Sequence, residues 1–224
     1  MKQATNEVSE DLPLFVCCIE LFIISIFKHL KTNTMKKLLL ILLLAPTVSC
    51  SDNLDDIKLS EDKKILLSEE EIILYDLIME YRIDNGLDKI PLSKSLTKVA
   101  QIHSIDQQNN PPDSDNNCNM HSWSNNGNWT SCCYTPDHAK ASCMWLKPSE
   151  ITDYIGNGYE ISYSSSGGVT AIKALEGWKS SVGHNNVIIN KAIWDDVTWN
   201  SIGIGIYNNY SNVWFGEEPD LTKN

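Results

Sequence analysis

The chain has 224 residues and a formal net charge of −11, with 18 Lys and Arg against 29 Asp and Glu. An acidic surface repels nucleic acid and offers it no basic patch, so we exclude nucleic-acid binding. The length beyond the N-terminal fifty residues is normal for one domain with a buried core.

A lipoprotein signal peptide is predicted over residues 35–50. Two lysines follow Met35, an apolar run extends from Leu38 to Leu44, and small residues then precede Cys50. This order is typical of a secretory leader with a lipidated cysteine at its end. We expect Cys50 to anchor the protein outside the cytoplasm, on a bacterial membrane, without a spanning helix.

Residues 1–34 fit such a leader badly, because a signal peptide begins at the N-terminus. We favour Met35 as the true start and residues 1–34 as a start-site error. The alternative is an extra membrane segment over Leu14 to Phe27, although this run is shorter than the ~20 apolar residues that a spanning helix needs.

The rest of the chain divides into three parts. Residues 51–67 are acidic and polar and predict a tether between lipid and domain. Residues 68–218 form the predicted domain, and residues 219–224 are a C-terminal tail. We expect a monomer.

The first predicted helix begins with a capping box formed by Ser68 and Glu71, and it ends at Asn85-Gly86. Its predicted apolar face consists of Ile73, Leu74, Leu77, Ile78 and Tyr81.

A second helix is predicted from Ser93 or Ser95 to about Gln108. His103 falls on its apolar stripe, where a core histidine with satisfied hydrogen bonds is the better interpretation than a ligand.

The segment from Asn109 to Pro148, which we call the cystine lobe, holds Cys118, Cys132, Cys133 and Cys143. Four cysteines in an exported, loop-rich segment favour two disulfides, and no C-x-x-C spacing supports the alternative of a zinc site. Adjacent cysteines do not pair with each other, so Cys132 and Cys133 each reach Cys118 or Cys143, in an order that the sequence leaves open. A short helix is expected over residues 139–145.

The C-terminal part combines strands with one helix. A short strand or turn is predicted at 158–163, and a helix follows with Val169, Ile172, Leu175, Trp178 and Val182 on one face, ending at Gly183-His184. A hairpin is predicted from the alternation in 202–207 and the run 213–215, with glycines where another element packs closely. Helices around short strands, without a βαβ rhythm, predict an α+β fold.

Five segments in this order match a known family: Tyr81 to Leu92, Val99 to Asp106, Trp178 to Ile188, Ile202 to Gly205 and Val213 to Gly216. Over residues 70–216 the chain resembles the CAP superfamily of cysteine-rich secretory, antigen 5 and pathogenesis-related 1 proteins, also called SCP-like, in its bacterial lipoprotein form. The resemblance implies a three-layer α-β-α sandwich with a disulfide-stapled loop lobe and a cleft lined by two histidines and acidic residues.

At matching positions the cleft histidines are His121 and His184, and the first glutamate is Glu160. Ser181 stands where many relatives have a second glutamate. If they converge in a cleft, His121, His184 and Glu160 can bind a divalent metal such as zinc or magnesium, with water at the open position, since imidazole and carboxylate are usual ligands. The same groups can instead hold a water or an anion by hydrogen bonds, or act as a base and acid pair.

Two other candidates have structural interpretations. His138 is expected to be a surface or capping group, and Glu176 is spaced to pair with Lys173 or Lys179.

Because Ser181 replaces an acidic group and no nucleophile motif surrounds it, we expect a binding protein rather than an enzyme. Its cleft ligand would be a divalent metal, a lipid, a glycan or another cell-envelope component. One alternative is a metal-assisted hydrolase that uses His121, His184 and Glu160. Another is a surface adhesin with a vestigial cleft.

Overall fold

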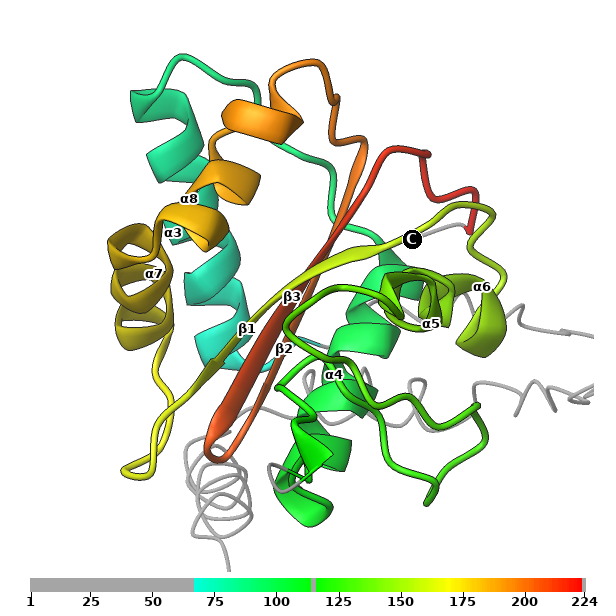
Figure 1. Ribbon diagram of the computed structural model, residues 1–224. Helices are drawn as coiled ribbons and strands as arrows, with labels where there is room; N and C mark the ends of the chain where they lie inside the picture. Colours follow the sequence, from blue (N-terminus) through cyan, green and yellow to red (C-terminus); the bar gives the residue numbers. More distant parts are fainter. Residues whose placement is uncertain (1–66, 114–115, 223–224) are drawn as a thin grey trace, which may run out of the picture. The chain divides into compact units, whose positions relative to one another are not determined.

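The computed structural model describes residues 67–113 and 116–222 (Figure 1). The predicted start-site segment, the signal peptide with Cys50, and the tether up to residue 66 lie outside the described residues. Within the described ranges, no helix has the length and apolar composition needed to cross a bilayer.

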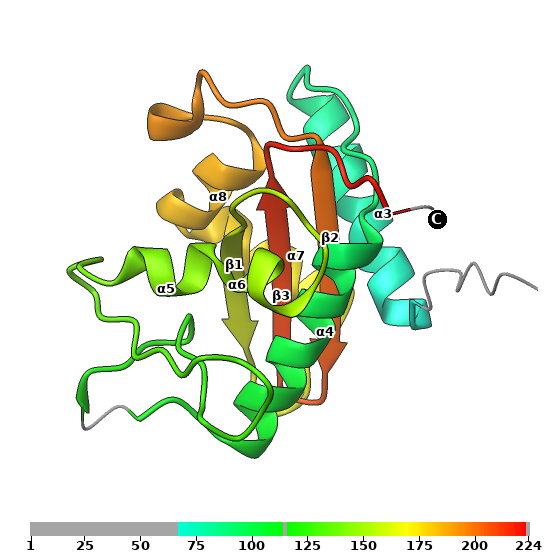
Figure 2. The ribbon, with the colours of Figure 1, turned by 90° about the vertical axis from the view of Figure 1, so that its right-hand side faces the viewer.

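A three-stranded antiparallel sheet, in the order β1-β3-β2, forms the middle layer. Figures 1 and 2 show helices on both of its faces, with α3, α7 and α8 on one side and α4, α5 and α6 on the other. This arrangement confirms the predicted α+β, three-layer fold. The elements are α3 (Glu69–Asp84), α4 (Lys94–Asn109), α5 (Ala141–Trp145), α6 (Lys147–Ile151), β1 (Tyr159–Ser164), α7 (Ala171–Ser180), α8 (Val182–Ile188), η2 (Ala192–Trp194), β2 (Ser201–Tyr207) and β3 (Tyr210–Gly216).

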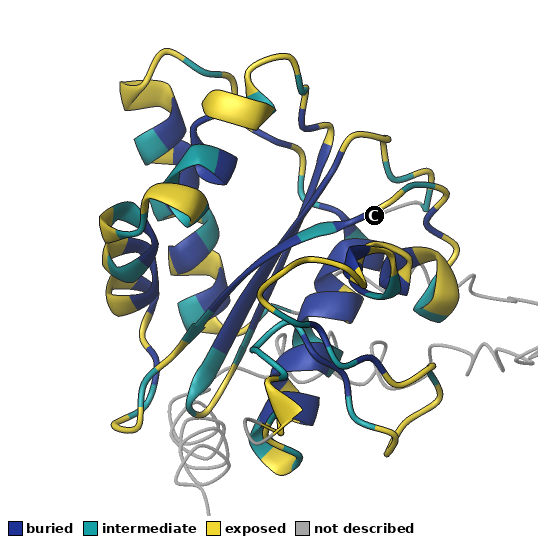
Figure 3. Cartoon of the chain, viewed as in Figure 1, coloured by how far each residue is buried: buried dark blue, intermediate teal, exposed yellow. Residues whose placement is uncertain are grey.

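Side chains alternate between the two faces along each strand, and this divides the buried interior into two clusters. Ile161 of β1 and Val213 of β3 belong to the core shared with α3 and α7, whereas Trp214 of β3 belongs to the core shared with α4 and the cystine lobe. Both faces of the sheet are therefore covered, as the buried strands in Figure 3 show. Successive residues of one strand point to opposite layers.

Helix α3 begins with the predicted capping box: Glu71 N donates to Ser68 Oγ, and Ser68 N donates to the Glu71 carboxylate. Its buried face differs from the predicted one. Met79 and Arg82 are buried, whereas Ile73 is 39% exposed. Arg82 can be buried because it donates a hydrogen bond to the buried carbonyl of Ile188, a contact that the periodicity of apolar residues does not signal.

Helix α4, capped by Ser93, packs directly on β2. A Cβ atom on Gly203 would lie 2.1 Å from the carbonyl carbon of Leu96, and one on Gly205 would lie 2.2 Å from that of Ala100. These glycines let the helix backbone touch the strand, which confirms the predicted close approach.

The helix predicted to end at Gly183-His184 is two helices. Helix α7 ends at Ser180 and α8 begins at Val182, so Gly183 lies inside the second helix and is not a stop signal. Val182, predicted on the buried face, is 77% exposed, and Ile172 is 65% exposed. The break at Ser181 changes the direction of the chain, so one helical period does not continue across it.

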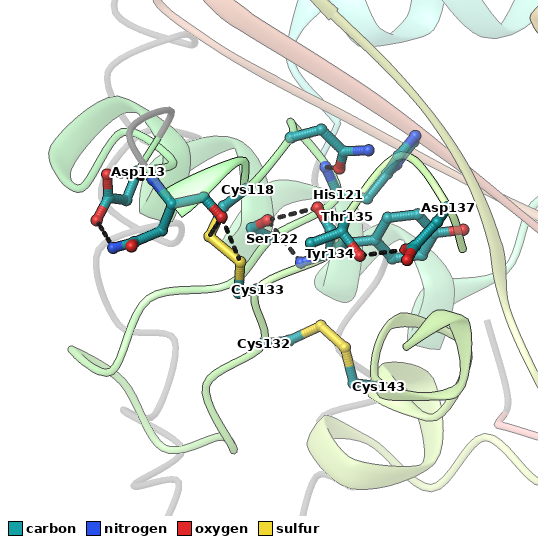
Figure 4. Close-up of a disulfide and its surroundings, with 12 residues drawn as sticks. Asp113, Cys118, His121, Ser122, Cys132, Cys133, Tyr134, Thr135, Asp137 and Cys143 are labelled. Atoms are coloured by element: carbon teal, nitrogen blue, oxygen red, sulfur yellow. Dashed lines mark hydrogen bonds between the residues drawn. A yellow bond between two sulfur atoms is a disulfide. The ribbon is translucent and has the colours of Figure 1, made fainter. Parts of the chain in front are cut away.

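Both predicted disulfides form, and the zinc alternative for these cysteines is wrong. Cys118 pairs with Cys133 and Cys132 pairs with Cys143, with Cα atoms 5.0 and 5.8 Å apart (Figure 4). An isolated antiparallel β-bridge, made by backbone hydrogen bonds between Trp123 and Cys132, closes the loop that follows His121. The lobe is thus held by covalent links where it has few regular elements of its own.

The segment predicted as a tail is attached to the domain. Asp220 accepts hydrogen bonds from the Ser93 hydroxyl and the Ser95 backbone at the start of α4. A carboxylate at a helix N-terminus satisfies amide groups that have no partner within the helix.

Candidate functional site

His121 and His184, the two histidines expected to line a cleft, line the same cavity. His121 comes from the cystine lobe and His184 from the first turn of α8, so the site joins two layers of the sandwich. The cavity has a volume of about 500 Å³. Its lining residues are Pro111, Pro112, Cys118, Asn119, Met120, His121, Ser164, His184 and Tyr210.

Glu160 lies behind His121, on the face of β1 that meets α4. Its side chain is fully buried, with Oε1 2.5 Å from His103 Nδ1 and Oε2 2.8 Å from His121 Nδ1. Burial alone would raise the pKa of Glu160, but its interactions with His103 and His121 outweigh burial and lower it. Glu160 therefore joins the two histidines instead of facing the cavity.

His103 was predicted as a core histidine with satisfied hydrogen bonds, and it is one. It is 0% exposed, and its Nε2 is 2.9 Å from the carbonyl oxygen of Ser122. What sequence reasoning missed is its direct contact with Glu160. The apolar stripe signals that His103 is buried, but no local pattern indicates a partner 57 residues away.

A polar network continues from Glu160 into the layer between β1, β3 and α4. Gln107 donates to the Ser162 hydroxyl, and the Asn212 amide contacts Gln107 and Ser104. With its amide turned the other way, Asn212 Nδ2 donates to Glu160 Oε1 at 3.2 Å. Buried polar groups are expected to be paired in this manner, and the pairing fixes their positions.

His184 is held in an environment that disfavours its charged form. Burial lowers its pKa below the ordinary value of 6.5, and the nearby His121 lowers it further, while Glu160 acts in the opposite direction. At neutral pH the cavity therefore contains a neutral His184, which can accept a hydrogen bond or bind a metal.

Ser181 is not brought to the cavity lining. Its backbone N–H donates to the Trp178 carbonyl, and its own carbonyl accepts from Asn185 N, so it forms the junction between α7 and α8. Ser181, which stands where many relatives have a glutamate, thus has a local structural role in this chain.

Of the three predicted metal ligands, only His121 and His184 have side chains that line the cavity. In the described part of the chain, no three His, Cys, Asp or Glu side chains are arranged to hold a metal ion. Both Glu160 oxygens are bonded to histidine nitrogens, which leaves His121 and His184 as two ligands where catalytic zinc sites use three. The three-residue set is therefore not assembled, and metal binding by the histidine pair stays a prediction.

The remaining candidates are as expected. His138 is an exposed residue of the cystine lobe, with Nδ1 2.8 Å from the Tyr134 hydroxyl. Glu176 forms a surface ion pair with Lys179 at 2.7 Å. Tyr134 was not predicted to be part of the site. Its buried ring packs edge-on against His121, with the ring centroids 5.2 Å apart.

Solved structures of bacterial proteins resemble this chain at low sequence identity. An outer surface protein of Borrelia burgdorferi is 19% identical, with a TM-score of 0.45 over 68% of this chain and 96% of that chain. An extracellular protein from Bacillus anthracis containing an SCP domain is 19% identical, with a TM-score of 0.46 over 66% of this chain and 40% of that chain. A cysteine-rich secretory protein from Staphylococcus aureus is 15% identical, with a TM-score of 0.42 over 66% and 39%.

No curated protein sequence matches the chain. A family model does match, over residues 75–216, which is more than half of the chain and includes His103, His121, Glu160 and His184. Its description is the cysteine-rich secretory protein family, or CAP. The chain therefore belongs to the CAP family.

Proposed function

We propose that this CAP protein is exported and held on a membrane by lipid on Cys50, and that its cavity binds an amphipathic cell-envelope ligand such as a lipid. Export is supported by the leader over residues 35–50 and by two disulfides, which persist in oxidising compartments.

The observation that carries the proposal is the position of His121. Its Nδ1 is held by Glu160, so Nε2 is the ring nitrogen that remains to meet a ligand, in a cavity shared with the neutral His184. Two imidazoles can accept hydrogen bonds from the polar head of a ligand.

The rest of the cavity suits an apolar part of the same ligand. Pro111, Pro112, Met120 and Tyr210 contribute apolar surface, and about 500 Å³ lies within the usual range for small-molecule sites. A flexible methionine adapts to chains of differing shape.

Calorimetric titration of the full chain with monoacylglycerol, which has donor hydroxyls and an acyl chain, tests this proposal. Binding is expected, and His121→Asn should weaken it about tenfold, which corresponds to ~1.4 kcal/mol. His138→Asn is the matched control, since His138 is outside the cavity lining. Absence of binding, or equal binding by wild type and His121→Asn, would reject the cavity as a lipid site and favour the adhesin alternative.

Lipid anchoring has a separate test. Cells expressing the wild-type chain should carry it in the membrane fraction and incorporate labelled palmitate, and Cys50→Ala should abolish both. Labelling that survives in Cys50→Ala would rule out Cys50 as the lipidation site.

A second candidate function, hydrolysis, is favoured by the Glu160–His121 pair. A carboxylate that accepts from Nδ1–H orients the imidazole and strengthens Nε2 as a general base for an attacking water. Peptide and cell-wall fragments should then be cleaved by the wild type, with or without added zinc, and not by His121→Asn or His184→Ala. Cleavage by both variants would place the reaction elsewhere.

A further inference from the structure

His103 lies at the back of the site, between Glu160 and the cystine lobe. Its ring stacks on Trp123, with centroids 4.1 Å apart and planes 4° apart. Nδ1 is 2.5 Å from Glu160 Oε1, and Nε2 is 2.9 Å from the Ser122 carbonyl oxygen. Both ring nitrogens therefore face oxygen atoms.

These contacts fix the number of protons. A backbone carbonyl only accepts, so His103 Nε2 carries a hydrogen. Two lone pairs cannot face each other at 2.5 Å, so a second proton lies between Nδ1 and Glu160 Oε1. Whether it belongs to the imidazole or to the carboxyl, the pair has no net charge, which suits its complete burial.

In both placements the proton is on the Oε1 side of Glu160, and Oε2 carries none. Oε2 can then only accept a hydrogen bond, and its partner at 2.8 Å is His121 Nδ1. His121 must donate from Nδ1, and a neutral His121 consequently has its lone pair on Nε2.

We infer that His103 is a positioning residue that fixes the tautomer of His121. Without a donor at position 103, Glu160 Oε1 would keep only the neutral Asn212 amide beside it, and burial would favour a protonated Glu160. Its hydrogen could then move to Oε2 and point at His121 Nδ1. His121 would then carry its hydrogen on Nε2 and lose its acceptor. The inference deepens the proposed function, which rests on that acceptor.

The test is a long-range proton–nitrogen NMR spectrum of the ligand-free full chain with labelled histidine, at about pH 8, where an ordinary histidine is neutral. In the wild type, His121 should be protonated at Nδ1. His103→Phe keeps an aromatic ring against Trp123 but has no donor, and most of its His121 should be protonated at Nε2. His103→Gln has an amide donor for Glu160 and should restore the wild-type tautomer.

If His103 only filled space, Phe would preserve the tautomer at least as well as Gln, and that result would overturn the inference. A wild-type His121 protonated at Nε2 would also overturn it, and this measurement needs no variant to fold. Since no ligand is present, a failure of lipid binding leaves the NMR result unaffected, and the two proposals can fail separately.

Discussion

The two faces of the sheet are built differently, although the same strands supply both. On β1, Ile161 points into the apolar core formed with α3, α7 and α8, while its neighbour Glu160 points to α4 and the cystine lobe. On β3, Val213 and Phe215 share the apolar face, and Asn212 belongs to the polar network. We call these sides the apolar face and the polar face.

The apolar face gains most of its stability from apolar packing, which is sensitive to shape and volume. The polar face buries a carboxylate and a histidine, which is tolerable because each of their hydrogen-bonding atoms has a partner. The site therefore lies on the side of the sheet that depends on hydrogen bonds and disulfides. Loss of either should disturb the position of His121 before it disturbs the apolar face.

Reduction of the disulfides is expected to have the largest effect. The bridges close loops with separations of 15 and 11 residues, and each should contribute ~2–4 kcal/mol to the free energy of unfolding. Hydrogen exchange measured with and without reductant should show faster exchange in the cystine lobe, while amides of α3 and α7 stay protected. Equal acceleration of exchange on both faces would show that the disulfides stabilise the two faces alike.

The substitution Gly205→Ala should have the next largest effect on stability. Its Cβ would lie 2.2 Å from the Ala100 carbonyl carbon, so α4 must shift away from β2, at a cost of about 3 kcal/mol in urea unfolding. The control is Gly167→Ala, where nothing lies within 4 Å of the added atom. Similar stability of the two variants would contradict close packing of α4 on the sheet.

Ser68→Ala removes the N-cap hydroxyl of α3, a helix of the apolar face. Loss of the capping box on α3 should lower the free energy of unfolding by ~1 kcal/mol and leave ligand binding unchanged. The exposed Ser166, replaced by alanine, serves as the control in the same denaturation series. Reduced ligand binding by Ser68→Ala would show that the two faces are coupled.

The pH dependence should give the smallest effect. Because burial lowers the pKa of His184, its stabilising contribution is present above about pH 6.5 and is lost as the pH falls through the folded-state pKa. Glu160, whose pKa is also lowered, acts in a separate window below its ordinary 4.5. Between about pH 6.5 and pH 4.5, melting temperatures should therefore decline in the wild type but not in His184→Ala. Identical profiles would refute the assignment to His184.

Local signals were sufficient for much of the fold. The capping box at Ser68, the N-cap Ser93, the glycines of β2 and the four cysteines each predicted a feature that the structure contains. Periodicity failed at Ile73 and Val182, which are exposed, because the orientation of a helix depends on its neighbours in space. The disulfide pairing was likewise left open, since four cysteines in one loop permit several connections.

Residues close together in the chain predicted the kinds of element, and a fixed order of motifs carried the family resemblance. His121 and His184 were expected in the cleft through that resemblance alone. The contacts of Glu160 with His103 and His121, and the position of Ser181 outside the cavity lining, became visible only in the folded chain. The physical reason is that a hydrogen-bond partner is chosen by burial and geometry across 57 residues of chain, which a local pattern does not encode.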